Sequence, residues 1–119
     1  MTDYLLLYRN GDSSWRERSP EELQQVMAQW NDWFKDLEAG GHLRNPGAPL
    51  APGGAVLRRS GEGFATDATL SEVKELVGGY SVIQAATLDE ATRLAQGSPF
   101  LRNNPNGDIV VRPVLVMDG

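Results

Sequence analysis

The segment from Asp67 to Ala86 constrains the fold more than any other part of the chain. A charged amphipathic stretch at 72–75 runs into the glycine pair Gly78-Gly79 and then into the β-prone run 80–83. The glycine pair precedes a strand rather than a helix, so it is not a phosphate-binding loop. The segment predicts a strand over 79–86, entered through either a helical turn or a short irregular arm.

A long helix is predicted to follow Ser19. Ser19 is a good N-cap, Pro20 takes the first helical position, and Glu22 completes a capping box. Gly40-Gly41 ends the helix, because glycine adopts the left-handed cap at little steric cost. One apolar stripe runs along it at helical spacing: Leu23, Val26, Met27, Trp30, Phe34 and Leu37.

The remaining elements are short and divided by turn signals. Thr87 and Glu90 form a second capping box, which opens a short helix ending at Gly97. Strands are predicted over Tyr4–Tyr8, over 55–59 and 63–66 as a hairpin, and over 109–117. The Pro/Gly-rich stretch 42–54 and the stretch 98–107 are predicted to be loops. Pro113 favours an edge, a bulge or a strand end at its position.

The resulting order, β-α-β-β-β-α-β, predicts an α+β fold. It matches a ferredoxin-like split β-α-β unit with an extra hairpin, in which an antiparallel sheet carries its helices on one face. The other sheet face would be bare, and valines with few charged neighbours lie on its strands: Val82, Val110, Val114 and Val116. A bare apolar face in a small chain is usually covered by a second copy, so we expect a homodimer with sheets packed face to face.

Composition excludes several classes of function. The chain has 119 residues, which indicates one domain, and no cysteine, which excludes disulfides and thiolate metal sites and fits a cytoplasmic protein. Net charge is −5 with scattered basic residues, so neither nucleic acid nor a membrane is an expected partner. No apolar run reaches the length of a membrane span, and no metal-ligand spacing is present. We expect no metal and no cofactor.

Four polar residues are candidates for a site. Asp67 follows a strand and could be a general base, or simply stabilise a turn. His42 is the only histidine and a natural proton carrier, or an exposed loop residue. Arg58 and Arg112 lie on predicted strands, where an arginine needs a carboxylate partner or a bound anion. We hypothesise that Asp67 shares a partly buried polar site with Arg58 first and Arg112 second.

The three tryptophans have different expected roles. Trp30 lies on the apolar stripe and is expected in the core. Trp33 is adjacent on the helix and could either line a substrate pocket or pack in the core. Trp15 stands in a polar loop, where it could close over a cavity or pack at the dimer interface.

Taken together, these pieces resemble the YCII-related family, also called the DGPF group. The matching residues, in chain order, are Tyr4–Leu7, Ser19–Glu22, Ala55–Arg58, Asp67, Glu72–Glu75, Gly78–Ile83 and Val111–Pro113. Ala68-Thr69-Leu70 stands where the family has Gly-Pro-Phe. The resemblance implies one domain over 1–119 and a ferredoxin-like monomer in a dimeric α+β barrel. Family members have mostly been proposed as enzymes from pocket residues, commonly a His with an Asp, and some occur beside sigma-factor-type regulators.

Two functions remain open at this point. The favoured one is a dimeric ligand-binding or regulatory domain, because the turn most distinctive of the family is altered and histidine is scarce. The alternative is a cofactor-independent lyase, isomerase or hydrolase-like enzyme. It would use His42 or Asp67 for proton transfer, and Arg58, Arg112 or Trp33 to hold a small anionic substrate. Convergence of His42, Asp67 and an arginine on one cavity would favour the enzyme.

Overall fold

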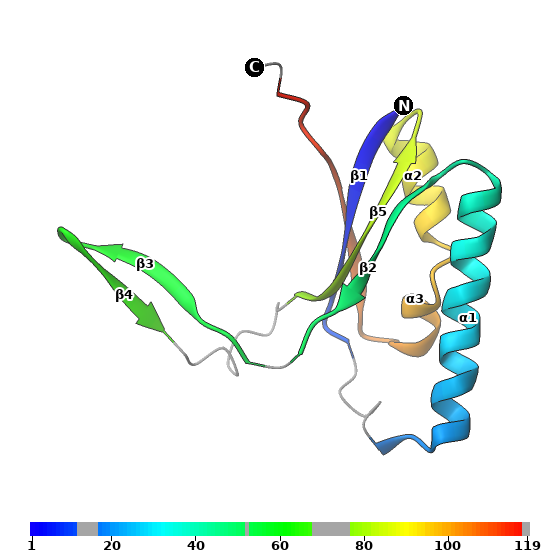
Figure 1. Cartoon of the computed structure of the whole chain (residues 1–119), viewed down its shortest axis with the longest axis horizontal. Coiled ribbons are helices and arrows are strands. Elements are labelled where there is room, and N and C mark those ends of the chain that lie inside the picture. Colours follow the sequence, from blue (N-terminus) through cyan, green and yellow to red (C-terminus); the bar gives the residue numbers. More distant parts are fainter. Residues whose placement is uncertain (12–16, 52, 68–76, 118–119) are drawn as a thin grey trace.

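The sheet carries its helices on one face, as the sequence predicts (Figure 1). The computed structural model describes residues 1–11, 17–51, 53–67 and 77–117. The elements are β1 (Thr2–Arg9), α1 (Pro20–Ala39), β2 (Leu43–Pro49), β3 (Val56–Ser60), β4 (Gly63–Asp67), β5 (Val77–Ala85), α2 (Leu88–Ala95), α3 (Pro99–Asn103) and β6 (Asp108–Pro113). Four strands pair antiparallel in the order β2-β5-β1-β6, which is the ferredoxin-like arrangement, and β3-β4 form a separate hairpin. The predicted α+β fold is confirmed.

Both predicted N-caps form, but the Glu22 carboxylate accepts from the Ser19 hydroxyl and the Glu90 carboxylate from the Ala86 backbone N–H, rather than from the backbone N–H of the N-cap residue. The Ser19 hydroxyl accepts a hydrogen bond from the Glu22 backbone N–H at 3.2 Å, and Thr87 does the same for Glu90 at 3.1 Å. Each cap satisfies a backbone donor that the first helical turn leaves unpaired. At the end of α1, Gly41 has φ +76°, the left-handed conformation that favours glycine.

Two segments predicted as loops form regular structure. The stretch 42–54 contains β2, an edge strand whose register against β5 shifts twice. Proline is tolerated there because an edge strand can leave a backbone position without a donor. The stretch 98–107 contains α3, which begins with Ser98 as N-cap and Pro99 at its start. The same Ser-Pro signal opens α1.

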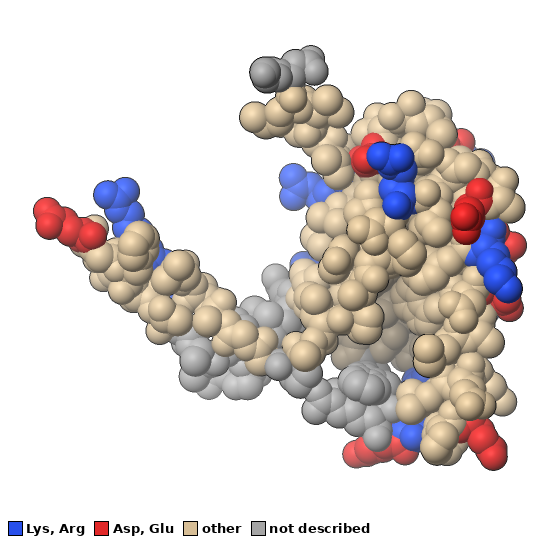
Figure 2. Space-filling model, in the orientation of Figure 1, with Lys and Arg blue, Asp and Glu red and all other residues tan. Residues whose placement is uncertain are grey.

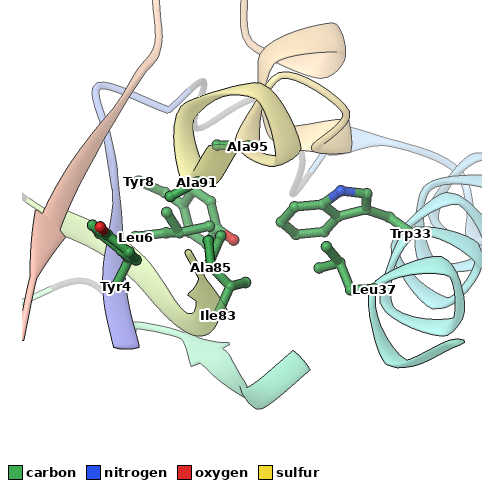
Figure 3. Close-up of a cluster of buried hydrophobic side chains, with 9 residues drawn as sticks. All are labelled: Tyr4, Leu6, Tyr8, Trp33, Leu37, Ile83, Ala85, Ala91 and Ala95. Carbon is green, nitrogen blue, oxygen red and sulfur yellow. The ribbon is translucent and has the colours of Figure 1, made fainter. Parts of the chain in front are cut away.

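The core lies between the sheet and the helices (Figure 3). Its most deeply buried large side chains are Leu6 of β1 and Ile83 of β5. From α1, Trp33 and Leu37 are buried, whereas Trp30 is only partly buried and Met27 is exposed. Of the predicted stripe only Met27 is exposed, but the buried face is centred nearer Trp33 than the stripe placed it, because apolar spacing alone does not distinguish Trp30 from Trp33. Nine buried residues form the cluster: Tyr4, Leu6, Tyr8, Trp33, Leu37, Ile83, Ala85, Ala91 and Ala95.

Two segments project from the body on the side away from the helices. The β3-β4 hairpin, which we call the arm, extends far from the sheet, and residues Val114–Met117, which we call the tail, continue past the end of β6 (Figure 1). The chain consequently spans 50 × 47 Å but is only 19 Å thick. Strand β6 ends at Pro113, so the predicted strand over 109–117 is too long. The bare face between arm and tail is the one expected to meet a second copy.

Candidate functional site

An open hollow lies between the end of α1 and the helix α2. It has a volume of about 260 Å³ and is lined by His42, Glu90, Arg93 and Leu94. His42 comes from the turn that joins α1 to β2, and the other three come from successive turns of α2. An imidazole, a carboxylate and a guanidinium therefore meet beside one apolar side chain.

A backbone carbonyl holds the imidazole of His42 in a defined orientation. His42 Nδ1 lies 2.8 Å from the Gln84 carbonyl oxygen. A carbonyl only accepts, so Nδ1 carries the proton and Nε2 keeps the lone pair in the neutral ring. The ring also lies against Gly40, where an added Cβ would be 2.9 Å from His42 Cδ2. The side chain is 21% exposed, so the ring can reach a ligand from a fixed position.

The Glu90 carboxylate caps the start of α2. One of its carboxylate oxygens, Oε1, accepts the Ala86 backbone N–H at 2.9 Å and lies 4.0 Å from His42 Nδ1. The capping contact spreads part of its charge into the helix terminus. If His42 is protonated, the Glu90 carboxylate is the negative charge next to the imidazolium.

Arg93 supplies the positive charge of the hollow. It lies three residues after Glu90 on α2, so both side chains share one side of the helix. Among the residues the structure describes, Arg93 has no ion-pair partner. A guanidinium with free donors can bind a carboxylate or phosphate through two parallel hydrogen bonds.

The arginines predicted from sequence do not reach this hollow. Arg58 is exposed on the arm, where it pairs in register with Ala65, while Asp67 is opposite Val56. Arg112 is exposed at the end of β6, beside Leu5. Both arginines are exposed in the single chain, and a polar site shared with Asp67 stays a prediction for each of them. The side chain of Asp67, the altered turn after it and Trp15 lie outside the described residues, so a catalytic role for Asp67 stays a prediction.

Trp33 is part of the core. Its side chain is 7% exposed, and its indole Nε1–H donates to the Leu94 carbonyl oxygen at 3.3 Å. These contacts correspond to the packing role that the sequence left open for Trp33. Binding of a substrate by Trp33 stays a prediction.

A second polar cluster is buried beneath the helices. The Tyr8 hydroxyl donates to Ser81 Oγ at 2.7 Å, and Ser81 Oγ donates to the Pro46 carbonyl oxygen at 2.7 Å. Burial raises the pKa of Tyr8 from 10.0 to about 12, and side-chain hydrogen bonds with Ser81 and Ser98 offset this in part. The Tyr8 ring packs on Trp30 with centroids 5.3 Å apart. Because every member found is hydrogen-bonded, this cluster serves to join β1, β2 and β5.

Glu90 and Arg93 were not singled out from the sequence as site residues. Glu90 was recognised only as a helix cap, and Arg93 was not distinguished from the other scattered basic residues. The sequence did contain one usable signal. Glu90 and Arg93 are three residues apart on a short predicted helix, which puts both side chains on the same side of it. Within the described part of the chain, no group of three or more His, Asp or Glu side chains is placed to hold a metal ion. None of the helices described there is long and apolar enough to cross a membrane.

Comparison with known families agrees with the fold. The model of the YCII-related domain matches residues 2–118, which is nearly the whole chain. The chain belongs to the YCII-related family. No curated protein matches the chain as a relative. Membership therefore establishes the family and leaves ligand and activity to be argued from the site.

Proposed function

We propose that this YCII-related chain is a homodimeric binding domain that takes a small anionic ligand in the hollow beside His42. The observation that supports this most is that Arg93, which has no ion-pair partner among the described residues, lies next to an imidazole held by the Gln84 carbonyl. Arg93 can hold an anionic oxygen, and His42 Nε2 can accept a hydrogen bond from a hydroxyl or acid proton of the same ligand. A small hydroxy acid or a protonated phosphate has both groups.

The bare face of the sheet supports the dimer. The register places Leu5 opposite Val82 and Leu7 opposite both Tyr80 and Val110 on this face. All five side chains are partly exposed in the single chain. Apolar side chains gathered on one sheet face favour a second copy, because association removes them from water.

Salt bridges border this apolar face at two ends. Arg9 pairs with Asp108 at 2.9 Å, and Arg44 pairs with Asp3 at 3.3 Å. Interfaces commonly have an apolar centre and a polar rim that tolerates water. The face has this layout, which supports face-to-face packing.

A binding role is favoured over catalysis because the arginines predicted from sequence to anchor a substrate do not join His42 in the hollow. Arg58 and Arg112 are exposed at positions away from the hollow, and Glu90 is occupied as a helix cap. The enzyme alternative rests on one group, the lone pair of His42 Nε2, which could act as a base toward a ligand held by Arg93.

Titration of ¹⁵N-labelled protein with lactate and inorganic phosphate, followed by NMR, tests the proposal. We expect saturable shifts of the backbone amides of His42, Glu90 and Arg93. Arg93→Gln should weaken binding by about tenfold or more, since a hydrogen bond to a charged group contributes about 1.5–3 kcal/mol. Arg102→Gln, which changes an exposed arginine of α3, is the matched control and should bind as the wild type. Absence of saturable shifts with either ion would refute the anion site.

His42→Gln separates binding from catalysis. Glutamine can still form a hydrogen bond but cannot accept a proton at neutral pH. If a bound compound is slowly consumed by the wild type and is stable with His42→Gln, the enzyme alternative holds. Binding without consumption by either protein supports the binding domain.

A further inference from the structure

The arm is a hairpin to which the described residues add no further strand. Leu57 is 66% exposed and Phe64 is 75% exposed. Leu57 pairs with Thr66 and Arg59 with Phe64, so Leu57 and Phe64 lie on the same face of the hairpin. Both outer edges of the arm lack strand partners among the described residues. An isolated two-stranded hairpin is marginal in water, and independent stability needs a third strand with an apolar face or packing against a helix.

The tail is a second unpartnered apolar segment. Val114 N–H still donates to the Asp3 carbonyl oxygen at 2.8 Å, but the described residues offer no backbone partner to the next three residues. Leu115, Val116 and Met117 are each between 78% and 82% exposed. No charged side chain interrupts the tail, which is uniformly uncharged in Figure 2. An extended, apolar segment of this kind is suited to add to the edge of a sheet.

Other exposed apolar residues do not form such segments. They occur singly on different elements, as Met27 does on α1 and Leu101 on α3, and single exposed apolar residues are normal. The arm, where Leu57 and Phe64 share one face with Arg59, and the tail are therefore the two places where exposed apolar side chains gather once the bare sheet face is covered.

We propose that the tail of one copy pairs with the arm of a second copy as a third strand. This inference rests on the proposed dimer. Within one chain the arm leaves at the Gly79 end of β5, and the tail leaves at the opposite end of the sheet, where Pro113 is paired through Tyr4 to Ile83. Both project toward the bare sheet face (Figure 1). The arm joins the β2 edge of the sheet and the tail follows β6 at the other edge, so the two leave from diagonal corners. A two-fold axis that lies between the packed sheets and crosses the strands obliquely exchanges these corners and brings each tail to the arm of the other copy.

The lengths and charges of the two elements are compatible. The arm strands have 5 residues each, and the described tail has four, Val114–Met117. The arm carries Arg58 and Arg59 against Glu62, and its tip shows basic and acidic side chains in Figure 2. A neutral tail adds no like charge to either group. Pairing would also cover strand edges that otherwise promote aggregation.

Cross-linking between separately tagged chains tests the arrangement directly, because the chain has no native cysteine. Leu57→Cys in one chain and Leu115→Cys in the other are mixed, allowed to exchange, and treated with a short bifunctional thiol reagent. We expect a cross-linked heterodimer carrying both tags. The matched control pairs Met27→Cys, exposed on α1, with Leu115→Cys and should give little product.

The oligomeric state measured on the same samples separates the two proposals. Sedimentation that shows a dimer, with no more product than the control pair, would refute the exchange of tail and arm while leaving the sheet-face dimer intact. Sedimentation that shows only monomer would overturn both.

A pair of charge substitutions on the arm gives a second test. Phe64→Asp places a charge on the apolar face of the arm, and Ala65→Asp places one on the opposite face. Phe64→Asp should raise the dimer dissociation constant about tenfold or more, as loss of a buried aromatic contact does at interfaces. Ala65→Asp should change it much less. Equal effects of the two substitutions would contradict the predicted face.

Discussion

Tyr8 should make the stability of this chain depend on pH in the alkaline range. Its ring is 5% exposed, its hydroxyl donates to Ser81 Oγ at 2.7 Å, and its ring packs on Phe100 with centroids 5.1 Å apart. Burial raises the pKa of this hydroxyl from 10.0 to about 12 in the folded state. In the unfolded chain the hydroxyl is in water and has its ordinary pKa.

The sign and size follow from proton binding in the two states. Between pH 10 and pH 12 the unfolded chain has lost the Tyr8 proton and the folded chain has kept it, so the free energy of unfolding falls as pH rises. The stabilisation is fully present below pH 10 and is lost as pH rises to about 12. Each pH unit corresponds to about 1.4 kcal/mol, so the total loss is roughly 3 kcal/mol.

Urea unfolding followed by tryptophan fluorescence at a series of pH values measures this loss. Tyr8→Phe keeps the ring and removes the titrating group, so subtraction cancels every other alkaline group. At neutral pH, Tyr8→Phe should cost about 1–2 kcal/mol, because Ser81 loses a buried hydrogen-bond partner. The difference between the two proteins should then disappear or reverse by pH 12. Parallel curves for wild type and Tyr8→Phe from pH 10 to pH 12 would refute the argument.

Three further substitutions test the core, the interface and the edge strand. Trp33→Ala should lower the free energy of unfolding by about 3–5 kcal/mol and Trp30→Ala by less, because Trp33 is the buried one; equal losses in urea would show that the helix face is assigned wrongly. Val82→Asp should convert the proposed dimer to monomer or aggregate, and an unchanged dimer by sedimentation would contradict face-to-face packing. Gly47→Ala should unfold the β2-β5 edge, because Gly47 has φ +74° and a Cβ there would overlap the Tyr80 carbonyl oxygen; retained amide protection of Tyr80 in hydrogen exchange would count against this.

The structure agrees with the predictions from sequence wherever these depend on a few neighbouring residues. The caps at Ser19 and Thr87 form as predicted, since a hydroxyl three residues before a backbone N–H needs nothing from the rest of the fold. The hairpin around Gly61 likewise forms, with φ +59° at that glycine. These local signals and their order were enough to predict the α+β fold and the family resemblance.

Tertiary structure decided what depends on residues far apart in the chain. Strand β2 forms because β5 supplies its hydrogen bonds and because the Ser81 hydroxyl donates to the Pro46 carbonyl oxygen. These contacts cannot be predicted from the Pro/Gly-rich sequence of the stretch itself. The choice of Trp33 over Trp30 depends on how α1 rotates against the sheet and on the Leu94 carbonyl that receives the indole N–H.

The candidate site shows the same division. The sequence singled out His42 as the natural proton carrier, because it is the only histidine in the chain. It did not identify Arg93 as its neighbour, since the two are brought together only when β2 and β5 pair and α2 packs beside them. Short stretches of sequence determine local hydrogen bonds and backbone preferences. A binding site depends on distances between residues far apart in the sequence, which only the packed chain defines.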